Sequence, residues 1–149
     1  MTLRVRLRVL FVSGVLLTLL GALHLAVTPL IVHMLRSGLS PGAVSWLTPP
    51  MLLNHVVVGI LLLPLGVLTV YASSDAASGV RWAVIVTRVI AVTIATLPPT
   101  LFALMGSRYF GAVPFRVATA IVCAASVTLL VAAFWPAAGA VASAKREAP

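Results

Sequence analysis

Long runs of apolar residues alternate with short polar segments along this chain. The apolar runs occupy about residues 9–34, 51–72, 82–105 and 115–135. Each has at least the roughly 20 residues that a helix needs to cross the hydrocarbon core of a bilayer. Because a backbone in lipid must satisfy its own hydrogen bonds, the runs are predicted to be helices and not strands. The pattern predicts an all-α polytopic integral membrane protein, folded as a bundle of four transmembrane helices.

Composition strengthens this prediction. Of the 149 residues, 62% are hydrophobic and 8% are charged, whereas a soluble domain carries about 25% charged residues. The length favours a single membrane domain over residues 1–149, with a short polar tail at 136–149. The segments "RSGLSPGAVSWLTPP", "SSDAASGVR" and "GSRYFGAVP" are predicted to be the loops. The first apolar run is longer than a signal-peptide core of about 7–15 residues, which favours an uncleaved first span.

The net charge of +8 comes from ten basic residues against Asp75 and Glu147. The basic residues flank the apolar runs and form no continuous basic face, so nucleic acid is not an expected partner. Anionic lipids are expected partners. Six basic residues fall on one side of the predicted bundle and three on the other, which predicts that both termini are cytoplasmic in the cell membrane. The six are Arg4, Arg6, Arg8, Arg81, Lys145 and Arg146, and the three are Arg36, Arg108 and Arg116.

Small and polar residues recur at helical spacing on the first two runs. One stripe holds Gly14, Thr18, Gly21, Leu25 and Thr28, and the other holds His55, Gly59, Leu62, Gly66 and Thr69. Small residues let helix backbones approach closely, which is a main source of packing energy in lipid. The two runs are therefore predicted to be antiparallel neighbours that meet through Gly21 and either Gly59 or Gly66.

Three histidines and one asparagine lie in or near these stripes. His24 and His55, beside Thr28 and Asn54, are predicted to face the bundle interior, because polar groups at such depths need partners. The structural interpretation is a neutral imidazole hydrogen-bonded to a hydroxyl, an amide or a free carbonyl. The alternative is haem b, ligated by His55 with either His24 or His33. The chain has no CxxCH motif for covalent haem and no His-rich cluster or intramembrane carboxylate for a metal site.

Arg88 is the charged side chain that lies well inside an apolar run. We expect it to extend towards the cytoplasmic head groups, with Asp75 as a nearby acidic partner for Arg88 or Arg81, or with an anionic lipid or substrate as a ligand. Pro29, Pro64 and the Pro98–Pro99 pair each remove a backbone donor. The pair is the strongest candidate for a helix break, and such breaks also form substrate sites in transporters.

No set of residues in the sequence assembles a known catalytic site, so no catalytic residue is assigned and an enzymatic activity is not expected. The favoured function is a non-catalytic subunit, an assembly partner or a homo-oligomer, because paired small-residue faces and few chemical groups support packing. The first alternative is a haem b-binding redox protein. The second is an oligomeric transporter or channel for small solutes.

Overall fold

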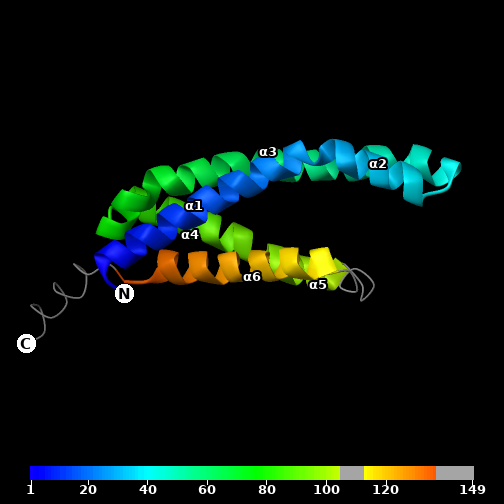
Figure 1. Cartoon of the computed structure of the whole chain (residues 1–149). Coiled ribbons are helices and arrows are strands. Elements are labelled where there is room, and N and C mark those ends of the chain that lie inside the picture. The colour runs from blue at the N-terminus through cyan, green and yellow to red at the C-terminus, as the bar shows by residue number, and fades with distance from the viewer. Residues whose placement is uncertain (105–112, 137–149) are drawn as a thin grey trace, which may run out of the picture. The chain divides into compact units, whose positions relative to one another are not determined.

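The computed structural model describes residues 1–104 and 113–136. Within these ranges the secondary structure is entirely helical (Figure 1). The helices are α1 (Leu3–Ala26), α2 (Thr28–Gly38), α3 (Pro41–Ser78), α4 (Arg81–Ala95), α5 (Leu97–Leu104) and α6 (Val113–Phe134). The chain divides into two compact units, one of Met1–Ser13 with Leu68–Pro149 and the other of Gly14–Val67. The prediction of a single membrane domain stays a prediction.

Three helices in the described part are long and apolar enough to cross a membrane. They are Leu3–Ala26, Pro41–Ser78 and the combined α4–α5 segment Arg81–Leu104. A shorter apolar helix covers Thr119–Phe134, which lies within α6. The length and composition of these helices are those of a membrane protein, as the apolar runs predict.

The first predicted loop is mostly helical, which corrects the sequence-based boundaries. α2 continues to Gly38 and α3 begins at Pro41, so only Leu39 and Ser40 separate them. Proline suits the first position of a helix, where its missing N–H would have no intrahelical acceptor. The sequence pattern predicts that Pro49 and Pro50 end the loop, but both lie inside α3, because a long apolar helix tolerates proline.

The second predicted loop is also shorter than expected. α3 continues to Ser78, and Gly79 adopts a positive φ of 91°. The Val80 N–H donates to the Asp75 carbonyl at 2.9 Å, and the Gly79 N–H donates to the Ala76 carbonyl at 3.2 Å. This is the Schellman arrangement, in which a left-handed glycine lets the chain reverse and satisfies the last carbonyls of the helix. The third predicted loop, except for Val113 and Pro114, and nearly all of the polar tail lie outside the described residues.

Two helix breaks each precede a proline by two residues. α1 and α2 are separated at Val27, before Pro29, and α4 and α5 are separated at Thr96, before Pro98. A proline cannot donate to the carbonyl four residues earlier, so the helix loses a hydrogen bond at that point. The Pro98–Pro99 pair, the strongest candidate for a break in the sequence, does follow an interruption of the helix, and the first apolar run, predicted as one helix, is interrupted as well.

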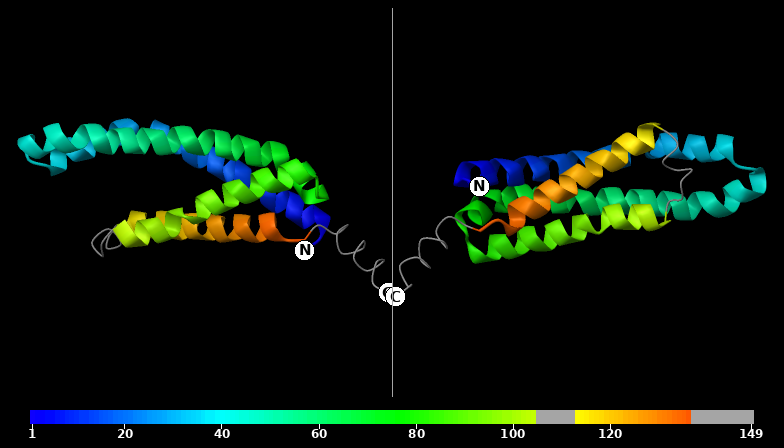
Figure 2. Two further views of the ribbon diagram at one scale, coloured as in Figure 1. Left: turned by 180° about the vertical axis from the view of Figure 1, so that it is seen from behind. Right: turned by 90° about the horizontal axis from the view of Figure 1, so that it is seen from below.

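In the unit of residues 14–67, the second half of α1 and then α2 run antiparallel to the first part of α3 (Figures 1 and 2). A Cβ atom placed on Gly21 would lie 2.8 Å from the Leu63 nitrogen and 2.9 Å from the Gly59 carbonyl oxygen. These distances are too short for a side chain, so the backbones pack directly against each other. The predicted contact between Gly21 and Gly59 is confirmed.

Gly66 belongs to the same interface but faces a different pair of residues. A Cβ atom on Gly66 would collide with the backbone nitrogen and hydroxyl of Thr18 and lie 2.7 Å from the Gly14 carbonyl oxygen. The stripe on α1 therefore meets the stripe on α3 at two levels, Gly21 with Gly59 and Gly14 with Gly66. Close approach of this kind is a main source of association between helices in lipid.

In the other unit, α6 packs against α4 and α5 (Figure 1). The buried positions there are mostly small, and include Ala83 and Ala91 of α4 and Ala132 and Ala133 of α6. The hydroxyl of Ser126 on α6 donates to the Val122 carbonyl of its own helix at 2.7 Å and lies 3.4 Å from the carbonyl oxygen of Ile94 on α4. Pro98 cannot donate to the Ile94 carbonyl, and the Thr96 N–H at the end of α4 points to it instead.

Candidate functional site

The two candidate histidines His24 and His55 lie face to face in the unit of residues 14–67. Their ring centroids are 4.8 Å apart and the ring planes are inclined by 27°. His55 Nε2 lies 2.7 Å from the backbone carbonyl oxygen of His24, and His24 Nδ1 lies 3.1 Å from that of Leu20. Since a carbonyl oxygen only accepts, both of these ring nitrogens carry a proton and donate it.

The backbone carbonyl of His24 accepts two side-chain hydrogen bonds. It accepts from the His55 ring and also from the Thr28 hydroxyl at 3.0 Å. Thr28 begins α2, directly after the break at Val27. A helix end inside a protein leaves carbonyls without intrahelical partners, and these need other donors. His55 therefore joins α3 to the α1–α2 break by a hydrogen bond to the backbone.

This geometry matches the structural interpretation of the histidines, in which an imidazole bonds a free carbonyl. Two axial histidine ligands of one haem iron must each point a ring nitrogen at the metal that lies between the two rings. The stacked rings of His24 and His55 present their faces to each other and leave no space for a porphyrin between them. Haem binding by this pair would require that the rings separate.

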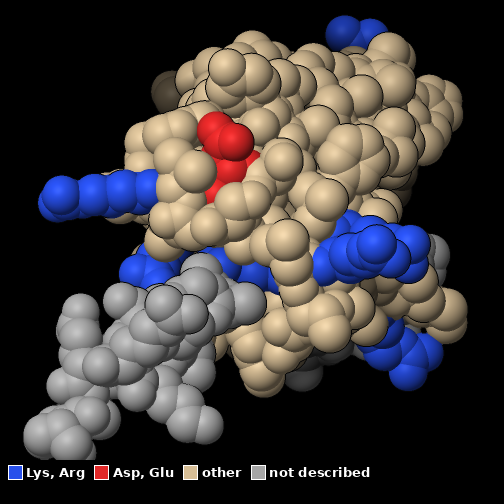
Figure 3. Space-filling view, turned by 90° about the vertical axis from the view of Figure 1, so that its left-hand side faces the viewer, with Lys and Arg blue, Asp and Glu red and all other residues tan. Residues whose placement is uncertain are grey.

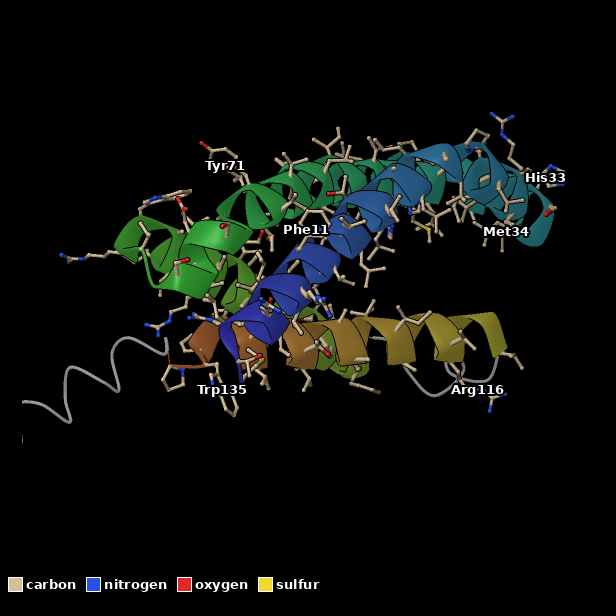
Figure 4. The ribbon with its side chains drawn as sticks, turned by 60° about the vertical axis from the view of Figure 1, so that its left-hand side comes forward. Phe11, His33, Met34, Tyr71, Arg116 and Trp135 are labelled. Carbon is tan, nitrogen blue, oxygen red and sulfur yellow. The ribbon has the colours of Figure 1, made fainter. Side chains whose placement is uncertain are left out.

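The remaining candidates in this unit do not join the pair. His33 lies exposed on α2 (Figure 4), and the contact of His55 is with His24. Asn54 is exposed on α3, beside His55 in the sequence. The described residues contain no group of three or more His, Cys, Asp or Glu side chains that could hold a metal ion.

A second cluster of polar groups lies in the other unit and is centred on Arg6. This side chain is only 2% exposed. Its Nε donates to the Ala132 carbonyl at 3.0 Å, and its terminal nitrogens donate to the carbonyls of Ala133 at 3.4 Å and Ala77 at 3.5 Å. These acceptors belong to the last turns of α6 and α3, where carbonyls lack intrahelical partners and carry partial negative charge. One guanidinium thus caps the C-terminal ends of two helices.

Arg88 reaches the same helix end from α4. Its Nε donates to the Ala133 carbonyl at 3.3 Å, and its guanidinium carbon lies 5.1 Å from the centre of the Phe134 ring. This distance is within the range of a cation–π interaction. The predicted contact of Asp75 with Arg88 or Arg81 is not present among the described residues, where neither arginine forms an ion pair.

Figure 3 views the end of the molecule where basic side chains gather. Asp75 is the only carboxylate side chain in the described residues, and it accounts for the acidic surface visible there.

From the sequence alone, Arg6 is interpreted as a topology signal and its capping role is missed. No local signal separates Arg6 from Arg4 and Arg8, since all three precede the apolar run that starts at Val9. The acceptors of Arg6 lie 71 to 127 positions away in the sequence.

No family model, curated protein or solved structure matches the chain. Its function is therefore inferred from the geometry of the two clusters and from the faces that the helices leave exposed.

Proposed function

We propose that this chain is a four-helix integral membrane protein that acts by association with another copy of itself, and that it has no catalysis of its own. In this proposal α6 is the fourth span, because its 22 residues correspond to about 33 Å of helix. Arg116 and Trp135 lie at opposite ends of α6 (Figure 4), as expected for groups at the two membrane surfaces. The distribution of basic residues supports cytoplasmic positions for both termini.

The internal hydrogen bonds support a structural use of the ionisable groups. Arg6, Arg88, His24 and His55 each donate to a backbone carbonyl. Three of these contacts (those of Arg6, Arg88 and His55) join separate helices. Side chains whose hydrogen bonds join one helix to another are used for packing and are not arranged around a substrate. A function by association is therefore favoured over catalysis.

The proposal rests on the exposed side-chain amide of Asn54. His24 lies twelve residues before Arg36, which corresponds to about 18 Å along α1 and α2. His55 is in contact with His24, so the adjacent Asn54 lies near the middle of a hydrocarbon core about 30 Å thick. The Asn54 side chain is exposed, and its neighbours Leu53, Val57 and Leu61 are exposed apolar residues. An amide exposed to lipid at this depth is costly unless it finds a partner.

An asparagine amide both donates and accepts, so it is complementary to the same amide of a second copy. Two copies related by a twofold axis can exchange two amide hydrogen bonds through one such face. Polar side chains of this kind contribute to helix association in membranes, at about 0.5–2 kcal/mol each. A second copy is therefore the partner that the Asn54 face fits best.

Cysteine crosslinking in native membranes tests this proposal. In a Cys123→Ala background, Val57→Cys places a thiol one turn from Asn54 on the same face. Val127→Cys is the matched control, since Val127 is an exposed valine of α6. We expect an oxidised dimer with Val57→Cys and much less with Val127→Cys. Equal crosslinking of both variants, or none with Val57→Cys, would contradict the proposal, and a crosslink only to a different protein would replace the second copy by that partner.

A further inference from the structure

The arginine cluster of the unit that contains α4 and α6 has more positive charge than its partners balance. Arg6 and Arg88 both approach the end of α6, and their acceptors are backbone carbonyls. A helix C-terminus carries roughly half a negative charge, so the ends of α3 and α6 together offset about one of the two cations. Neither arginine has a carboxylate partner among the described residues. An anion at this place would complete the charge balance.

Arg88 is the member of the cluster that an external anion can reach. Arg6 is buried, while Arg88 is partly exposed. The Arg88 Nε donates to Ala133, and its two terminal nitrogens form no hydrogen bond with the described residues. The Phe134 ring holds the guanidinium in place at 5.1 Å. A guanidinium fixed in this way can present two parallel N–H groups to a phosphate.

The surface next to Arg88 is an apolar groove. It is lined by Arg88, Val89, Val92, Thr93 and Phe134. The Thr93 hydroxyl donates to the Val89 carbonyl of its own helix at 3.0 Å, so this side chain places no unsatisfied polar group in the groove. The groove thus has one cationic residue beside an aliphatic and aromatic wall. A free inorganic anion would use only the cation, whereas a lipid would use both parts.

We propose that this groove binds an anionic phospholipid, with the phosphate at the terminal nitrogens of Arg88 and an acyl chain along Val89, Val92 and Phe134. The depth agrees with this placement. Arg88 lies seven residues beyond Arg81, about 10 Å along α4, and its long stem brings the guanidinium back towards the head groups. The site lies on other residues than the Asn54 face and does not depend on self-association.

Lipid retention by the purified full-length chain tests the proposal. The protein is equilibrated in mild detergent with equal amounts of phosphatidylglycerol and phosphatidylcholine, and the bound lipids are counted by native mass spectrometry. Wild-type protein should retain phosphatidylglycerol preferentially. Arg88→Gln should lower that retention by about fivefold or more, which is the effect of one basic residue near a lipid surface. Arg81→Gln, an exposed arginine with the same change of charge, should retain the wild-type preference.

A second variant tests whether the groove itself is needed for lipid retention, independently of the charge of Arg88 and of the stability of the fold. Val92 is exposed in the groove, so Val92→Trp should fill it and lower phosphatidylglycerol retention while Arg88 stays in place. Inorganic phosphate in millimolar excess should not displace the lipid from wild-type protein. Equal losses in Arg81→Gln and Arg88→Gln, unchanged retention in Val92→Trp, or displacement by inorganic phosphate would each overturn the proposal.

Discussion

The ring of His55 donates a 2.7 Å hydrogen bond to the backbone carbonyl of His24 and stacks on the His24 ring at 4.8 Å. One contact thus joins α3 to the end of α1, at a level where the helix is interrupted. The polar groups that suggested a cofactor site are, in this geometry, part of the packing between two helices.

Replacement of His55 should separate a structural role from a ligand role. His55→Gln retains a donor and should cost little stability, whereas His55→Leu removes the donor and should cost about 0.5–2 kcal/mol. His33→Gln, at an exposed histidine, is the control and should have no effect. The measurement is unfolding in mixed detergent micelles followed by circular dichroism. If His55→Gln and His55→Leu were equally damaging, the hydrogen bond would not be what His55 contributes.

Absorption spectroscopy addresses the haem hypothesis directly. Because the stacked rings leave no space for a porphyrin, we expect the purified protein to be colourless and to remain without a Soret band after addition of haemin. A Soret band that disappears in both His24→Gln and His55→Gln would show that the rings separate to bind haem.

The glycine contacts predict that the effect of a Gly→Ala substitution on stability depends strongly on which glycine of α3 is replaced. Gly66→Ala forces a methyl group onto the Thr18 backbone, and overpacking of this kind costs about 1–3 kcal/mol. A methyl group on Gly42 would meet no atom within 4 Å, so Gly42→Ala should be neutral or slightly stabilising, since alanine favours helix over glycine by up to about 1 kcal/mol. Thermal unfolding of the two variants in the same detergent gives the comparison. Equal melting temperatures would mean that α1 and α3 do not pack through Gly66.

Arg6 should be the arginine whose loss is most damaging. Arg6→Leu removes donors from three buried carbonyls, and we expect a loss of about 2–4 kcal/mol, since each unsatisfied buried acceptor costs about 1–3 kcal/mol before relaxation. Arg4→Leu and Arg8→Leu, both at exposed positions, should change stability by less than about 0.5 kcal/mol. Arg6→Lys should lie between, because an ammonium cannot reproduce the planar fork. Unfolding in detergent micelles gives the order of stability of these variants. If Arg8→Leu were the least stable of them, the capping role of Arg6 would be contradicted.

The sequence predicts the helical class and the main packing face, because apolar run length and small-residue spacing are local signals. Gly21, Gly59 and Gly66 lie where their spacing predicts. The predicted boundaries are wrong around Pro41 to Pro50, since residues that end helices in water are compatible with helix in an apolar segment. The choice between His24 and His33 as the partner of His55 depends on the register of α3 against α1 and α2. A sequence does not supply that register.

The role of Arg6 could not be predicted for a different reason. A basic residue before an apolar run is typical of a membrane topology signal, and nothing local distinguishes Arg6 from Arg4 or Arg8. The distinction arises only when the ends of α3 and α6 come together and leave their carbonyls without donors. Capping by a residue so distant in the sequence is a property of the tertiary structure.

The central claim is that copies of this chain associate through the face of α3 that contains Asn54. Fluorescence energy transfer between labelled copies, measured in liposomes as the protein is diluted with lipid, tests it most directly. Wild-type protein and Thr128→Val, a control that removes an exposed hydroxyl already bonded to its own helix, should retain energy transfer at dilutions where Asn54→Leu has lost it. The expected shift in the half-dissociation point is about 3- to 15-fold, equivalent to about 0.6–1.7 kcal/mol. Identical dilution curves for wild-type protein and Asn54→Leu would contradict the claim.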